Sequence, residues 1–146
     1  MAMSIDLEKY AGKYYEIYKQ NAFYAFGCEA STAEYKVIPE GLSVLNICYS
    51  ENGTGQMYTM KQPELRALRD IRGIATPTDV NGEYDLLFET GQSGLYKIFY
   101  TDYVYSMVGD LRTNYMTIIS KIPYPSQKKI NELLLMAEDF GFKLEK

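Results

Sequence analysis

Eight short segments in which polar and apolar side chains alternate follow one another between residues 12 and 121. Alternation with a period of two is typical of β-strands that bury one face. Most connections between the segments are short and carry turn residues, of which Asn81-Gly82 is the strongest hairpin signal. We therefore expect strands over residues 12–18, 30–37, 42–49, 68–76, 84–89, 95–101, 103–108 and 115–121.

The pattern changes after the eighth segment. From Ser126, which can cap a helix, apolar side chains recur at helical spacing until Gly141, which can end it. A helical turn is also expected over residues 6–11. These elements predict an all-β fold: an eight-stranded antiparallel up-and-down β-barrel, about residues 12–121, with a short N-terminal helical turn and one C-terminal α-helix, about 126–140, packed outside the barrel.

Composition limits the chemistry of the chain. With 146 residues, 47% apolar and 23% charged, we expect a single domain over residues 1–146. The sequence contains no histidine, which excludes catalysis by histidine and zinc or haem held by histidine; neither a metal nor a cofactor is expected. The net charge of -4, with Lys and Arg scattered along the chain, argues against nucleic acid as a partner.

The N-terminus has no basic region followed by an apolar run. This pattern predicts a cytosolic protein, or a periplasmic or secreted one if a leader has been removed. No apolar stretch approaches the roughly 18 residues that a membrane-spanning helix needs. Peripheral association with a membrane, and either a monomer or a weak homodimer, stay open at this point.

Three short motifs carry a resemblance to a known family. Residues 12–17 read Gly-Lys-Tyr-Tyr-Glu-Ile, Thr101-Asp102-Tyr103 stands between the sixth and seventh expected strands, and Lys121 ends the eighth. In this order the motifs resemble those of the lipocalins, in the branch of bacterial lipocalin and apolipoprotein D. The resemblance covers nearly the whole chain and implies the same barrel.

Two residues depart from the family pattern. The lipocalin motifs have a Trp and an Arg that close the narrow end of the barrel, whereas this chain has Tyr14, two residues after Gly12, and Lys121. Tyr is a weaker cation–π partner than Trp, and an ammonium group cannot stack like a planar guanidinium. We expect a weakened contact between the two side chains, with Lys121 also seeking backbone carbonyls.

Alternation assigns an inward-facing set of side chains, aromatic with polar tips, as the candidate ligand-binding residues. These are Glu16, Tyr18, Ala33, Tyr35, Phe88, Tyr96, Ile98, Tyr100, Ser106, Tyr115 and Thr117. Each could equally be ordinary core packing, because a barrel of eight strands can be filled by its own side chains. Buried phenols need hydrogen-bond partners, so their number favours a cavity with water or a ligand head group.

Glu16 and the two cysteines leave alternatives open. An inward Glu16 could hold the polar head of a ligand, or pair with Lys121 or a tyrosine near the closed end. A hairpin centred on residues 39–42 places Ala33 opposite Cys48, so a Cys28–Cys48 disulfide needs the chain before the second strand to fold back until the two Cα atoms lie within about 7 Å. Both the bridged and the free state remain open.

The resemblance implies a function without catalysis: binding or transport of a small hydrophobic or amphipathic ligand, of the fatty acid or lysophospholipid type, inside the barrel. Burial of an acyl chain would supply the driving force. Two other classes stay open. One is an isomerase-like enzyme that uses Glu16 with a tyrosine, or Cys48 as nucleophile. The other is a filled barrel that binds a partner or a membrane surface through the aromatic loop over residues 23–26.

Overall fold

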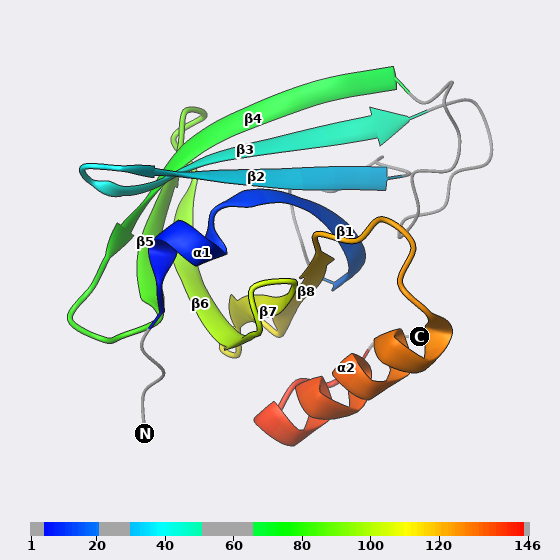
Figure 1. Cartoon of the computed structure of the whole chain (residues 1–146). Coiled ribbons are helices and arrows are strands. Elements are labelled where there is room, and N and C mark those ends of the chain that lie inside the picture. The colour runs from blue at the N-terminus through cyan, green and yellow to red at the C-terminus, as the bar shows by residue number, and fades with distance from the viewer. Residues whose placement is uncertain (1–4, 21–29, 51–65, 145–146) are drawn as a thin grey trace.

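The computed structural model, described over residues 5–20, 30–50 and 66–144, is a barrel of eight strands with a helix at its side (Figure 1). A short helix, α1 (Leu7–Tyr10), precedes the barrel and a longer one, α2 (Gln127–Phe140), follows it. The strands are β1 (Gly12–Gln20), β2 (Ala30–Ile38), β3 (Gly41–Ser50), β4 (Arg66–Pro77), β5 (Glu83–Phe88), β6 (Ser93–Thr101), β7 (Tyr105–Asp110) and β8 (Tyr115–Ser120).

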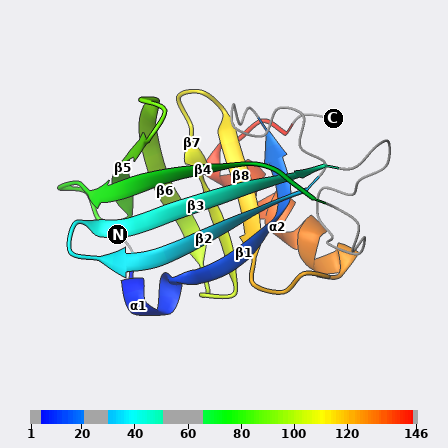
Figure 2. The same ribbon diagram turned by 90° about the horizontal axis from the view of Figure 1, so that it is seen from above.

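Each strand pairs antiparallel with the next, and β8 pairs with β1 to close the sheet. The predicted up-and-down barrel, with its N-terminal helical turn and C-terminal helix, is confirmed. Figure 2 shows α1 beside the start of β1, and we call this end of the barrel the α1 end. The end at which β1 finishes is called the opposite end.

Two turns differ from the sequence prediction. The β2–β3 turn is tighter than expected: Ser31 lies opposite Cys48 and Ala33 opposite Asn46, so the predicted pairing of Ala33 with Cys48 is wrong. Gly41 makes the tight turn practicable because its φ of 145° is open to glycine. Strand β7 starts at Tyr105, two residues later than predicted, because the chain turns at residues 102–104.

Helix α2 forms as its sequence predicts. The Ser126 hydroxyl accepts a hydrogen bond from the Lys129 backbone N–H, and Gly141, with a φ of 114°, ends the helix in the left-handed region. The buried residues of the helix, Ile130, Leu133 and Ala137, pack with outward side chains of β1, β7 and β8. This cluster of outward side chains and helix residues is called the outer cluster.

One extra residue in β1 reverses the alternation along that strand. Glu16 lies opposite Ile119 and Tyr18 opposite Ile118, so Ile17 is inserted as a β-bulge. Residues directly opposite each other in a sheet point to the same face. Because Ile118 belongs to the outer cluster, Tyr18 points outward and also packs there, so its predicted inward orientation is wrong. Lys19, opposite Thr117, takes the inward position instead.

A second bulge acts in the same way on β6. Ile98 lies opposite Val108 and Tyr100 opposite Met107, so Phe99 is the inserted residue. Met107 is in the outer cluster, and Tyr100 packs against that cluster, so the inward orientation predicted for Tyr100 is also wrong. Tyr18 and Tyr100 therefore point away from the barrel interior, because each follows an inserted residue that strict alternation does not predict.

Candidate functional site

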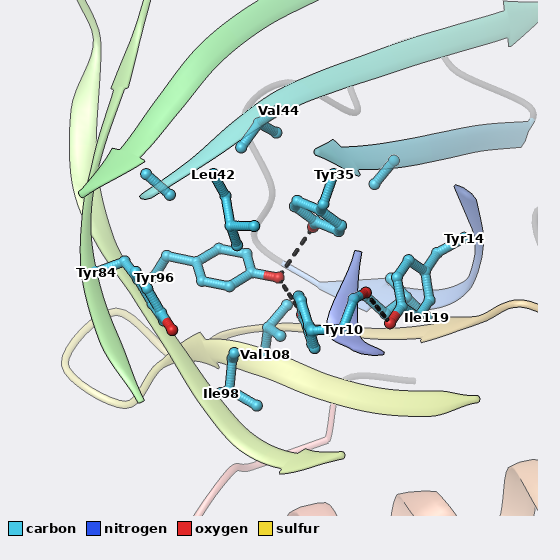
Figure 3. Packing of buried hydrophobic residues seen from close by; sticks show 12 residues of the cluster. Tyr10, Tyr14, Tyr35, Leu42, Val44, Tyr84, Tyr96, Ile98, Val108 and Ile119 are labelled. Atoms are coloured by element: carbon cyan, nitrogen blue, oxygen red, sulfur yellow. Dashed lines mark hydrogen bonds between the residues drawn. The ribbon is translucent and has the colours of Figure 1, made fainter. Parts of the chain in front are cut away.

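Tyrosines close the barrel at the α1 end (Figure 3). The rings of Tyr10 and Tyr35 lie 5.4 Å apart between centroids, Tyr10 and Tyr14 lie 5.6 Å apart, and Tyr35 and Tyr96 lie 5.9 Å apart. The Tyr84 ring extends the stack, 6.2 Å from Tyr96. These distances suit tilted and edge-to-face aromatic pairs. The α1 end is therefore a packed aromatic floor.

The buried phenols of this floor bond to one another. The Tyr96 hydroxyl donates to the Tyr35 hydroxyl at 3.0 Å, and the Tyr10 and Tyr96 hydroxyls lie 2.5 Å apart (Figure 3). Burial raises the pKa of all three well above the ordinary value for tyrosine. For Tyr35 and Tyr96, two of the predicted inward phenols, the partners are other phenols of this chain, Tyr10 included, and not the water or ligand head group that the sequence favoured.

Tyr14 and Lys121 meet at the same end, as the sequence predicts. The Lys121 ammonium lies 5.3 Å from the centroid of the Tyr14 ring and donates to the Lys9 carbonyl at 2.9 Å. Gly12 leaves the room for this, because a Cβ there would lie 3.2 Å from the Lys121 side chain. Partial burial lowers the pKa of Lys121 and raises that of Tyr14 to about 12. The predicted contact to a backbone carbonyl is confirmed.

The Thr101-Asp102-Tyr103 motif ties the β6–β7 turn to α1. Thr101 and Ser106 hydroxyls lie 2.7 Å apart, and the Tyr103 hydroxyl accepts from the Asp6 backbone N–H at 3.1 Å. The Asp102 carboxylate accepts from the backbone N–H groups of Val104 at 2.9 Å and Tyr105 at 2.7 Å. The motif is therefore structural.

Asp102 titrates below its ordinary range. Desolvation alone would raise the pKa of Asp102, but hydrogen bonds from the Tyr105 and Val104 backbone and from the Tyr100 hydroxyl outweigh it. The carboxylate therefore keeps its charge, and the turn its hydrogen bonds, under mildly acidic conditions.

A buried polar group lies farther along β1, toward the opposite end. The Lys19 ammonium contacts the Glu16 carboxylate at 3.2 Å, and the two side chains are 6% and 2% exposed. The Ser31 hydroxyl donates to Glu16 at 2.6 Å and also accepts a hydrogen bond from Lys19. We call these three residues the Glu16–Lys19–Ser31 group. The proposed pairing of Glu16 with Lys121 is not found, because Lys121 lies at the α1 end.

A small cavity separates this polar group from the aromatic floor. Its volume is about 10 Å³, enough for about one water molecule. Neutral and aromatic side chains make up the wall, with one carboxylate among them. The lining residues are Glu16, Tyr35, Val44, Asn46, Leu86, Phe88, Tyr96, Val108, Tyr115, Thr117 and Ile119.

Six of the predicted ligand-binding residues line this cavity. Three others, Ala33, Ile98 and Ser106, are buried in the barrel without lining it. Lys19 and five of the lining residues were absent from the predicted ligand-binding set; the five are Leu86, Val108, Ile119, Val44 and Asn46. The β2–β3 register puts Val44 opposite Tyr35, so the correct register would have predicted Val44 and Asn46 as lining residues. Lys19 points inward because of the residue inserted in β1, and that insertion has no comparable sequence signal.

The cysteines and the aromatic loop are only partly described. Cys48, buried on β3, is disulfide-bonded. Its predicted partner, Cys28, and the aromatic loop over residues 23–26 lie outside the described residues. In the described ranges, no three of the residue types His, Cys, Asp and Glu gather closely enough to hold a metal ion. Neither described helix has the length and apolarity to cross a bilayer.

A closed eight-stranded barrel with an aromatic floor and a polar group in its interior belongs to the class of barrels that can enclose one small molecule. The sequence assigns this barrel to a family: the lipocalin-like domain matches residues 5–146, and the chain belongs to the lipocalins. The resemblance read from the three motifs is thereby confirmed.

Two known proteins illustrate the relationship. The chain is similar to outer membrane lipoprotein Blc of Vibrio cholerae, with 29% identity over 141 residues that cover 94% of this chain and 77% of the relative. Its fold is similar to that of insecticyanin from the tobacco hornworm Manduca sexta, with a TM-score of 0.64, 18% identity, and coverage of 95% of this chain and 76% of the other. Family membership implies binding of a small hydrophobic ligand.

Proposed function

We propose that this lipocalin binds and carries a small amphipathic molecule, of the fatty acid or lysophospholipid type, inside its barrel and without catalysis. The observation that carries the proposal is the buried Glu16–Lys19–Ser31 group beside a cavity whose other walls are neutral. Buried charges are costly and contribute little net stability, so a polar group kept inside a barrel suggests use by a ligand.

The arrangement of the interior suggests how the ligand lies. The aromatic floor offers apolar surface for an acyl chain, whose burial is worth about 25 cal/mol per Å². The polar group near the opposite end offers partners for the head. The present cavity holds about one water molecule, so uptake requires lining side chains such as Leu86 and Phe88 to move apart.

Binding of a fluorescent fatty-acid analogue, with displacement by unlabelled lipids, tests the proposal. Thr117→Phe fills the cavity from β8, whereas Thr76→Phe adds the same bulk to an exposed position on β4. We expect Thr117→Phe to weaken binding at least about tenfold and Thr76→Phe to leave it unchanged. A melting curve for each variant checks that it is folded, since overpacking costs about 1–3 kcal/mol.

A wild-type protein that binds no lipid, and that carries none when purified from its own source and examined by native mass spectrometry, would refute the proposal. Equal binding of the fluorescent analogue by Thr117→Phe and Thr76→Phe would show that the lipid site lies outside the barrel interior.

The Vibrio relative is an outer membrane lipoprotein, and we propose that this chain, as a monomer or weak dimer, meets its ligand at a membrane surface. Vesicle co-sedimentation tests that step.

A further inference from the structure

The interior of the barrel contains the charged side chain of Lys19, which regular strand alternation would direct into solvent. The bulge at Ile17 brings Lys19 inward, opposite the buried Thr117, and within 3.2 Å of Glu16. Both side chains are more than nine-tenths buried. Together they form an ion pair with no net charge.

The two charges are not equally placed toward the cavity. Glu16 lines the cavity wall, whereas Lys19 and Ser31 do not. The ammonium is already directed at Glu16 and at the Ser31 hydroxyl. A ligand head that occupies the cavity is therefore next to the Glu16 carboxylate, whereas the matching positive charge of Lys19 lies outside the cavity wall.

A second carboxylate at this place would be unfavourable. It would lie beside Glu16 in a region shielded from water, where repulsion between like charges is strong. A bond to Lys19 would divide one ammonium between two carboxylates and leave one buried negative charge that is not neutralised. A head group with no net charge avoids this cost, and Asn46, Tyr115 and Thr117 on the cavity wall can hydrogen-bond to it.

From this geometry we infer that the interior site selects amphiphiles whose head group has no net charge over amphiphiles with a free carboxylate, and that Glu16 sets the selectivity. The inference rests on the proposed function and narrows its ligand class. An uncharged glycerol ester and a zwitterionic phospholipid head share the required property. A fatty acid with an ionised carboxylate lacks it.

Three ligands with the same acyl chain test the inference: monolauroylglycerol, lauroyl-lysophosphatidylcholine and laurate. Each is titrated against the fluorescent analogue on the wild-type protein at neutral pH. We expect at least one of the two ligands without net charge to bind about tenfold or more tightly than laurate. Whether the glycerol ester, the zwitterion or both do so identifies the source of the head group.

Glu16→Gln removes the negative charge that faces the cavity and should raise the affinity for laurate about tenfold or more, because Lys19 then needs a counter-charge. If this variant is unstable, laurate should raise its melting temperature more than it raises that of the wild type. The double variant Glu16→Gln, Lys19→Met should lose the gain. The matched control is Glu83→Gln, which removes a carboxylate that lies 3.7 Å from the Lys97 ammonium on the outer face of the barrel. This variant should bind the three ligands in the same order of affinity as the wild type.

The inference is wrong if laurate equals or exceeds both other ligands on the wild type, or if Glu16→Gln leaves the order of affinities unchanged. In either case lipid binding itself would stand. Failure of all three ligands to displace the analogue would instead refute the proposed function, and the inference with it.

Discussion

Single side chains at the α1 end show how a barrel rich in tyrosine keeps its phenols paired. Tyr96 lies between Tyr10 and Tyr35, and its hydroxyl bonds to both. Loss of one oxygen would therefore remove two buried hydrogen bonds at once. A buried polar group that loses its partner costs about 1–3 kcal/mol.

Tyr96→Phe is therefore expected to lower the free energy of unfolding by about 1–3 kcal/mol. Chemical denaturation measures the change, with Tyr15→Phe, a half-buried tyrosine whose ring lies beside Lys13, as the control. The control should change stability by less than about 0.5 kcal/mol. Equal effects of the two substitutions would contradict the phenol chain.

The lowered pKa of Asp102 predicts how the stability of the protein changes in acidic solution. Its pKa is lower in the folded protein than in the unfolded chain, so its contribution to stability is complete above pH about 4 and is lost as the pH falls through the folded pKa. Asp102→Asn keeps the size of the side chain and removes the charge. At neutral pH the variant should be less stable by at most about 1 kcal/mol, since the site is exposed.

The measurement is denaturant unfolding at neutral pH and at pH about 3. The difference between wild type and Asp102→Asn should shrink at the lower pH, while Asp85→Asn, on an exposed position of β5, should give no such convergence. A gap between wild type and Asp102→Asn that widens on acidification would show that the sign of the pKa shift is wrong.

At the scale of elements, α2 is held to the barrel by one narrow face. Leu133 is almost fully buried in the outer cluster, whereas Leu135 on the opposite side of the helix is 63% exposed. A leucine removed from a packed core costs about 2–5 kcal/mol. The two leucines, two positions apart, provide a matched pair.

Leu133→Ala should lower the free energy of unfolding by about 2–4 kcal/mol, and Leu135→Ala by less than about 1 kcal/mol. Thermal and chemical denaturation give both values. Comparable losses would mean that α2 does not pack in the orientation described.

The strands and their order could be predicted because alternation and turn residues act locally. The two bulges could not. Ile17 can be buried on either face, and residues 98–100 read Ile-Phe-Tyr, so no polar residue marks the insertion. For the site, Glu16 was correctly placed inward, since it precedes the bulge. Lys19 was missed because its orientation depends on how the whole of β1 pairs with β8.

For the whole molecule, the distribution of tyrosines predicts sensitivity to alkali. Tyr10, Tyr35 and Tyr96 have pKa values raised well above the ordinary range by burial, and that of Tyr14 is raised to about 12. An unfolded chain ionises its phenols near pH 10. The folded state therefore binds more protons, and its stability should fall as the pH rises above about 10.

Denaturant unfolding at pH about 9 and about 11 measures this loss. The absorbance of phenolate at the higher pH should rise further when the protein unfolds, because the buried tyrosines ionise only then. A constant free energy of unfolding across this range would contradict the burial of these hydroxyls.

The inserted Ile17 has a consequence for how chains of this kind change over time. Residues on both sides of it keep their facing partners on β8, so the strand tolerates one residue more than its neighbour. Loss of Ile17 would leave the residues on either side of it opposite the same partners on β8, and would leave the inward side chains of β1 unchanged. An alignment without a gap at Ile17 would match outward positions of this strand with inward positions of a chain that lacks the bulge, and would misplace the inward Lys19.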